Sequence, residues 1–222
     1  MGSEDEAESR QSAVDFYAAM AYSELCAFER FSADARFSPT LRDRIAIGKL
    51  AAGEFAHFEL ASTELAGLGA AVEEAMRPFQ PFVDAFHERT RPADWYEALM
   101  KAYVADALSG DFYRAVADYL DPRSRDLVAR IKADTGQAEV LRARLAQAVS
   151  EDARLASRLA LWGRRLVAEA LTQAQHMAFG TQGSGALLRQ ADPAERREAA
   201  DALSARLTGN HSRRMRALGL TA

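Results

Sequence analysis

Apolar residues recur along most of the chain at steps of three and four, the spacing that gives a helix one buried face. Prolines at positions 39, 78, 81, 92, 122 and 193 divide this pattern into segments. Ser38 and Asp121 precede prolines in the order typical of a helix start, and Gly69 provides a helix stop. The pattern predicts helices over residues 12–35, 39–68, 93–120, 122–149, 152–179 and 193–217, with a loop at 180–185.

The segment 70–92 differs from the rest of the pattern. Pro78 and Pro81 interrupt it, so we expect a short helix, a break and a second short piece. It separates two pairs of long predicted helices. Two helical hairpins joined by one long crossover are the connectivity of a ferritin-like bundle. We therefore predict an all-α fold, a ferritin-like antiparallel four-helix bundle with one or two additional C-terminal helices.

Composition refines this picture and limits the partners. The 222 residues suit a single domain, predicted over 12–222 after a disordered acidic N-terminus at 1–11. No apolar stretch approaches the roughly 20 residues that cross a bilayer, so no membrane partner is expected. One cysteine, Cys26, and an acidic start that is unlike a signal peptide favour a cytoplasmic protein. The net charge of −4 creates no general attraction to nucleic acid, and the apolar last helices would suit a homodimer.

Candidate chemistry begins with Glu54 and His57 on the second predicted helix. Residues three apart share a helix face, so this carboxylate and imidazole can bind one metal ion together. Glu24 and Glu54 lie equally far from Pro39, so an antiparallel hairpin brings them level. Both stand among small or apolar neighbours, where a charge is costly unless something binds it. The alternative is a solvated helix face or a core histidine.

The second predicted hairpin offers Asp106 and Asp134 at comparable distances from Pro122, with Asp111 as the next choice after Asp106. Gln137 follows Asp134 at the same three-residue spacing as His57 follows Glu54. Four acidic groups and one or two further ligands facing a bundle core would form a di-iron or di-manganese site. The alternative for both aspartates is an ion pair with a nearby cation: Lys101, Arg130 or Lys132.

Two segments resemble the ferritin-like non-haem di-iron superfamily: YSEL at 22–25 and EFAHFE at 54–59. Others resemble an actinobacterial branch related to the tRNA 2-methylthio-isopentenyladenosine hydroxylase: DAFHERT at 84–90, LWGRRL at 161–166 and HSRRM at 211–215. The resemblance extends from about residue 17 to residue 218.

The resemblance implies two irons bound by Glu24, Glu54, His57, Asp106, Asp134 and the position of Gln137. It also implies a dioxygen-dependent hydroxylase with an external electron donor and tRNA as a partner. Gln137 departs from the family pattern, which has histidine there, and an amide oxygen is a much weaker ligand for iron. One iron, or none, is therefore an alternative to two.

Two further hypotheses follow from these departures. The bundle has lost its redox site and serves as a binding or structural protein, or it hydroxylates a small metabolite rather than tRNA. The acidic net charge favours the metabolite over tRNA.

Overall fold

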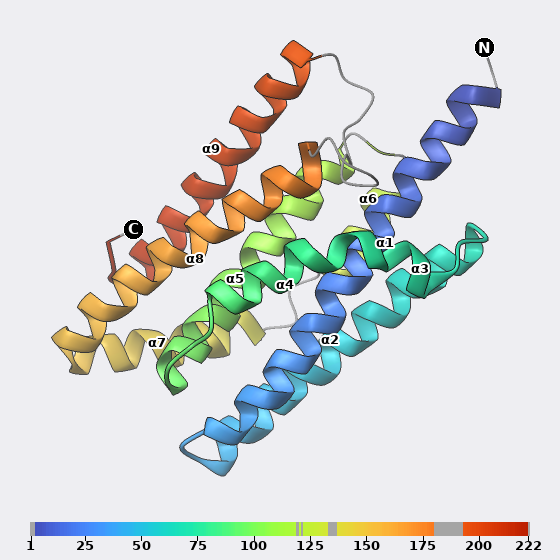
Figure 1. Cartoon of the computed structure of the whole chain (residues 1–222). Helices are drawn as coiled ribbons and strands as arrows, with labels where there is room; N and C mark the ends of the chain where they lie inside the picture. The colour runs from blue at the N-terminus through green and yellow to red at the C-terminus, as the bar shows by residue number, and fades with distance from the viewer. Residues whose placement is uncertain (1–2, 119, 121, 133–136, 180–192, 222) are drawn as a thin grey trace.

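The computed structural model describes residues 3–118, 120, 122–132, 137–179 and 193–221, and the described residues form helices and turns without any strand. Figure 1 shows long helices running side by side, with shorter ones across them. The predicted all-α class is confirmed. No helix among these residues is both long and apolar enough to cross a membrane.

Helices α1 (Ser3–Asp34) and α2 (Leu41–Gly67) form a hairpin through the short 3₁₀ helix η1 (Ala35–Phe37). Residues 3–11 form the first turns of α1, and the Glu and Ala residues of this segment are good helix formers. The predicted cap of α2 at Ser38 was wrong. Pro39 holds Ser38 in an extended conformation, and Thr40 caps α2 by accepting a 3.1 Å hydrogen bond from the Asp43 N–H.

The crossover follows directly after α2. Gly69, with φ of +72°, adopts the left-handed conformation that ends the helix, as predicted. The chain then forms α3 (Val72–Met76), the 3₁₀ helix η2 (Arg77–Phe79) and α4 (Gln80–Arg89). Pro78 lies within η2 and Pro81 in the first turn of α4. The two predicted short pieces are present, but the 3₁₀ helix η2 joins them directly in place of the predicted break.

The second half starts with α5 (Trp95–Ala117), capped by Asp94 through a 3.0 Å bond from the Glu97 N–H. The single helix predicted over 122–149 is two helices, α6 (Pro122–Ile131) and α7 (Gln137–Glu151). The sequence between them contains Asp134, Thr135 and Gly136, which are poor helix formers. The fourth bundle position is therefore divided.

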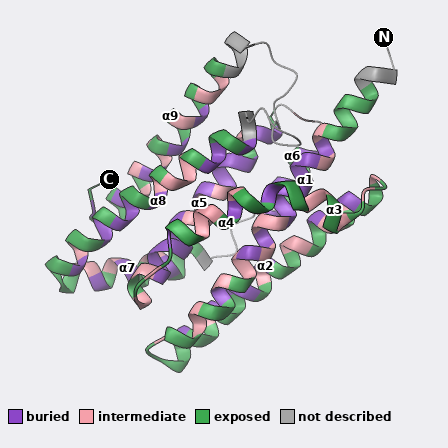
Figure 2. Ribbon diagram, viewed as in Figure 1, coloured by how far each residue is buried: buried purple, intermediate pink, exposed green. Residues whose placement is uncertain are grey.

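Helices α8 (Ala153–Phe179) and α9 (Pro193–Ala217) agree with the predicted C-terminal helices. Helix α8 packs against α5 and α4, and α9 packs against α8 and α5. Gly163 permits this close packing, because a Cβ atom there would lie 2.6 Å from Met215 Cε and 3.1 Å from Met100 Cε. Figure 2 shows buried positions where the long helices face one another and exposed positions on their outer sides.

Candidate metal centre

Three side chains from the first hairpin converge inside the bundle. Glu24 lies in the middle of α1, and Glu54 and His57 lie one turn apart on α2. One ligand atom from each lies within 4.8 Å of the other two. His57 Nδ1 is 3.3 Å from Glu54 Oε2 and 3.5 Å from Glu24 Oε2. The hairpin thus places Glu24 and Glu54 at the same height, as their equal spacing from Pro39 predicts.

Burial and mutual contact set the protonation of this group. Burial raises the pKa of Glu54 to about 8, and the neighbouring Glu24 carboxylate adds to the effect. Burial would lower the pKa of His57, but Glu24 and Glu54 outweigh it and raise the value to about 9. Without a metal, one carboxylate and the imidazole therefore hold protons near neutral pH. A bound cation would replace them.

Lys132, directly after α6, completes the polar cluster from the other side. Its Nζ lies 2.9 Å from Glu24 Oε1 and 3.0 Å from Asp106 Oδ1, and its side chain is only 5% exposed. Burial opposes a charge on Lys132, yet Asp106 and Glu24 hold its pKa well above the usual range. Burial likewise opposes a charge on Glu24, and the Lys132 ammonium keeps the Glu24 pKa below its usual range. The two form a buried ion pair.

The remaining predicted ligands are not assembled with this group. Asp106 on α5 contacts Lys132, which is one of the ion pairs considered as the alternative to metal binding. Asp111 contacts Arg114 and Arg214 instead. Asp134 and the side chain of Gln137 lie outside the described residues. The structure therefore brings together Glu24, Glu54 and His57 and leaves the second half of the predicted ligand set untested.

Comparison with known protein families places this arrangement in context. A family model for the ferritin-like domain of actinomycetes matches residues 7–190, which is most of the chain. The chain belongs to this ferritin-like family. A search of curated proteins found no match. The match supports the ferritin-like superfamily and does not extend to the tRNA hydroxylase branch.

The ligand set of this ferritin-like chain fits one transition-metal ion. Two carboxylates and one imidazole are a donor set suited to iron. Neither buried oxygen of Glu24 accepts a well-formed hydrogen bond from a described residue, although Lys132 Nζ forms an ion pair with one of them. Beside this group, the ammonium of Lys132 contacts both Glu24 and Asp106.

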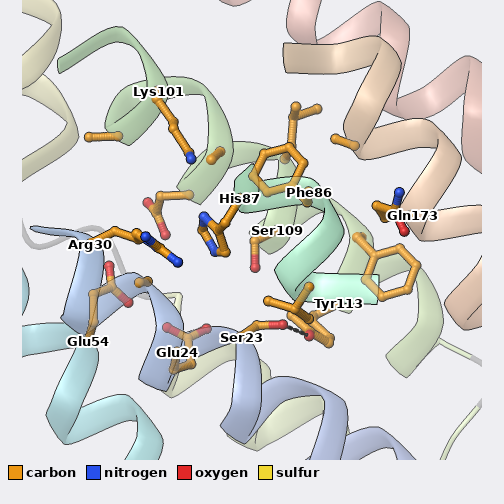
Figure 3. Close-up of a pocket in the computed structure, with 18 of the residues that line it drawn as sticks. Ser23, Glu24, Arg30, Glu54, Phe86, His87, Lys101, Ser109, Tyr113 and Gln173 are labelled. Carbon is orange, nitrogen blue, oxygen red and sulfur yellow. Dashed lines mark hydrogen bonds between the residues drawn. The ribbon is translucent and has the colours of Figure 1, made fainter. Parts of the chain in front are cut away.

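A cavity of about 130 Å³ adjoins the site in the ferritin-like bundle. Glu24, Glu54 and Lys132 line one part of it, and most of the remaining lining is apolar. Figure 3 shows Glu24 and Glu54 on the same side of this space, with Phe86 and His87 across it. Tyr113 and Ser23 join by a 2.8 Å hydrogen bond at its edge. The candidate ligands thus face a space that can hold a small molecule.

Sequence reasoning missed two features of this site. Lys132 is adjacent in space to Glu24, but the helices α2 to α6 separate them in the sequence, which suggests Lys132 only as a partner of the aspartates. The cavity lining comes from α1, α2, α4, α5, α8 and α9, so no local pattern reports it. One signal in the sequence was the position of Lys132 directly after the apolar residues Leu127, Val128 and Ile131 of α6, which suggests a buried setting.

Proposed function

We propose that this chain is a non-haem metal oxidoreductase that binds one iron ion through Glu24, Glu54 and His57. The observation that carries the proposal is the convergence of these three ligand atoms within 4.8 Å, inside a ferritin-like bundle. Glu24 and Glu54 are 1% and 5% exposed, so their charges need a partner inside the protein. A metal ion would provide that partner.

The protein's own residues would hold and tune this ion. Glu54 and His57 bind from one face of α2, and Glu24 approaches from α1. Lys132 supplies a fixed positive charge beside Glu24, in the place where a two-metal site would have its second cation. Bound iron would supply dioxygen chemistry, in which a C–H bond, O₂, two electrons and two protons give an alcohol and water. The electrons would come from an external donor.

Among hydroxylase substrates, we favour a small metabolite over tRNA. The cavity beside the ligands is about 130 Å³, and its walls are mainly apolar side chains. The chain carries a net charge of −4, so it lacks the general positive field that draws proteins to nucleic acid. These two properties suit a small, largely apolar molecule.

A second candidate function is a ferritin-like bundle that binds or supports a partner without redox chemistry. Its specific support is the contact of Lys132 with both Glu24 and Asp106. The single ammonium contacts both carboxylates and offsets one of their two negative charges, so part of the buried negative charge is balanced without a metal ion.

Metal content after iron-supplemented expression tests the proposal. We expect about one iron per chain by mass spectrometry, and none in a Glu54→Ala, His57→Ala double variant. Glu59→Ala, which changes an exposed glutamate of α2, is the matched control and should keep the iron. Oxygen consumption by the loaded protein with a chemical reductant then tests redox activity. A wild-type protein that binds no metal would contradict the proposal and favour the second candidate.

A further inference from the structure

The cavity has a second polar region besides the carboxylates of the candidate metal centre. Arg30 from α1, His87 from α4 and Lys101 from α5 line it. Figure 3 shows the guanidinium of Arg30, the ring of His87 and the ammonium of Lys101 directed toward the same part of the cavity. Three elements that are distant in the sequence thus bring nitrogen donors together.

These donors are poorly satisfied by the protein itself. Lys101 is 5% exposed, and its Nζ donates one 2.9 Å hydrogen bond to the Thr90 carbonyl oxygen, although an ammonium has three donors. The Arg30 Nε and the His87 Nδ1 are buried without a hydrogen-bond partner among the described residues. Neither Arg30 nor Lys101 forms an ion pair with a described acidic residue within 4.0 Å. Buried donors of this kind normally have partners.

The electrostatics agree with an excess of positive charge. Burial and the neighbouring Arg30 lower the pKa of Lys101 to about 8. Burial, Lys101 and Arg30 lower the pKa of His87 well below its usual range. Asp34 also lines the cavity, and its charge interacts with both Lys101 and Arg30. Two cations against one carboxyl group leave about one positive charge for a ligand to neutralise.

The rest of the lining indicates what the ligand carries besides its charge. Phe86, Leu108, Phe112 and Met177 contribute apolar surface to the same space. The Lys101 ammonium lies 5.4 Å from the centre of the Phe86 ring, so charged and apolar surfaces meet at that point. A ligand that matches the cavity has an anionic head and an apolar body.

We propose that this cavity binds a small organic monoanion, a carboxylic acid whose carboxylate contacts Arg30, His87 and Lys101 and whose apolar body packs against Phe86 and Phe112. A monoanion matches the single positive charge better than a phosphate dianion does. The body then extends past the apolar wall toward Glu24 and Glu54. Its role as the oxidised substrate rests on the proposed function, whereas its binding does not.

Isothermal titration of the metal-free protein at pH 7 tests this inference with two acids, octanoate and 4-phenylbutyrate, and with octanol and 4-phenylbutanol as neutral counterparts. We expect at least one acid to bind and to do so about tenfold or more tightly than its alcohol, because a charge-assisted hydrogen bond is about twice as strong as a neutral one. Failure of both acids to bind, or equal affinities of acid and alcohol, would overturn the inference.

Variants assign the binding to the proposed residues. Arg30→Met should weaken acid binding about tenfold and leave alcohol binding within about twofold. Arg44→Gln, at an exposed arginine of α2, removes the same charge away from the cavity and should have no effect. Helical circular dichroism and metal content, measured on the same preparations, verify folding. Unchanged acid affinity in Arg30→Met would overturn the inference.

The metal measurement separates this inference from the proposed function. If the wild-type protein bound iron but neither acid, the anion site would be overturned and the proposed function would not. Acid binding in a protein that takes up no iron would support the anion site and contradict the proposed function.

Discussion

Two buried lysines line the same cavity in opposite electrostatic settings. Lys132 contacts two carboxylates, and they hold its pKa well above the usual range against the effect of burial. Lys101 has a backbone carbonyl as its hydrogen-bond acceptor, and burial together with Arg30 lowers its pKa to about 8. Burial is similar in the two cases, so the difference lies in the partners.

The two lysines therefore differ in their partners: the charge of Lys132 pairs with carboxylates of the protein, whereas the charge of Lys101 can pair with a ligand. Lys132 forms ion pairs with Glu24 and Asp106 inside the protein. Lys101 and its neighbour Arg30 have no such carboxylate partner among the described side chains. We therefore expect the same change at the two lysines to give different results.

The largest expected effect is on stability, with Lys132→Met. Removing one partner of a buried ion pair leaves the other charge uncompensated, which costs about 3–5 kcal/mol in free energy of unfolding. Lys101→Met should cost only about 1 kcal/mol, because one hydrogen bond to a carbonyl oxygen is lost. Urea denaturation of the metal-free proteins measures both. If both variants lost the same free energy of unfolding, the two lysines would not differ in their electrostatic partners as described.

Next in size is the effect of Glu54→Ala on metal binding. Loss of a ligand should weaken the affinity for iron at least about a hundredfold, since changes beyond the ligands already cost ten- to a hundredfold. Octanoate affinity should stay within about twofold, because Glu54 is not among the proposed carboxylate-binding residues. Titrations with ferrous iron under anaerobic conditions and with octanoate measure the two. If the affinities for iron and for octanoate fell together, the metal ligands and the carboxylate-binding residues would form a single site.

A smaller effect is expected from pH on octanoate binding. The pKa of Lys101 is about 8, so its positive charge is present below this value and is lost as the pH rises through it. Affinity should therefore fall roughly three- to tenfold between pH 7 and pH 9.5. Besides burial, the charged groups acting on Lys101 are Arg30, Asp34, Glu88 and Arg91.

Lys101→Met is the control for this pH dependence. Its octanoate affinity should be weaker at pH 7 and nearly constant up to pH 9.5. A variant that keeps the full pH dependence would show that another group titrates.

The smallest effect should come from Asp106→Asn. The Asp106 side chain is 44% exposed, so its ion pair with Lys132 is screened by water and contributes no more than about 1 kcal/mol. Glu24 remains to pair with Lys132, and iron affinity should change less than threefold. A loss of iron comparable with that of Glu54→Ala would mean that Asp106 is itself a metal ligand.

Much of the fold could be predicted because its signals are local. Gly69 marks the end of α2 and Asp94 the start of α5, and Pro78 and Pro81 lie where the crossover changes between α-helix and 3₁₀ helix. The level placement of Glu24 and Glu54 needed only the geometry of an antiparallel hairpin around one proline. These inferences use neighbours in sequence or a single turn of the chain.

The remainder depends on contacts between distant elements. The division of the predicted helix at 122–149 places Lys132 directly after α6, and only the packing of α6 shows that Lys132 faces Glu24. Arg30, His87 and Lys101 come from three elements, so no spacing in the sequence indicates that they share a cavity. The predicted ligands Asp134 and Gln137 lie outside the residues whose side chains the structure describes.

Crystallography of the iron-loaded protein, with anomalous scattering recorded at the iron edge, tests whether one iron ion binds to Glu24, Glu54 and His57. We expect one strong anomalous peak per chain, bound by these three residues, with the Lys132 ammonium still between Glu24 and Asp106. Two peaks with Lys132 displaced from Asp106 would contradict this expectation and indicate a two-iron centre. A single peak bound by other residues would contradict it as well.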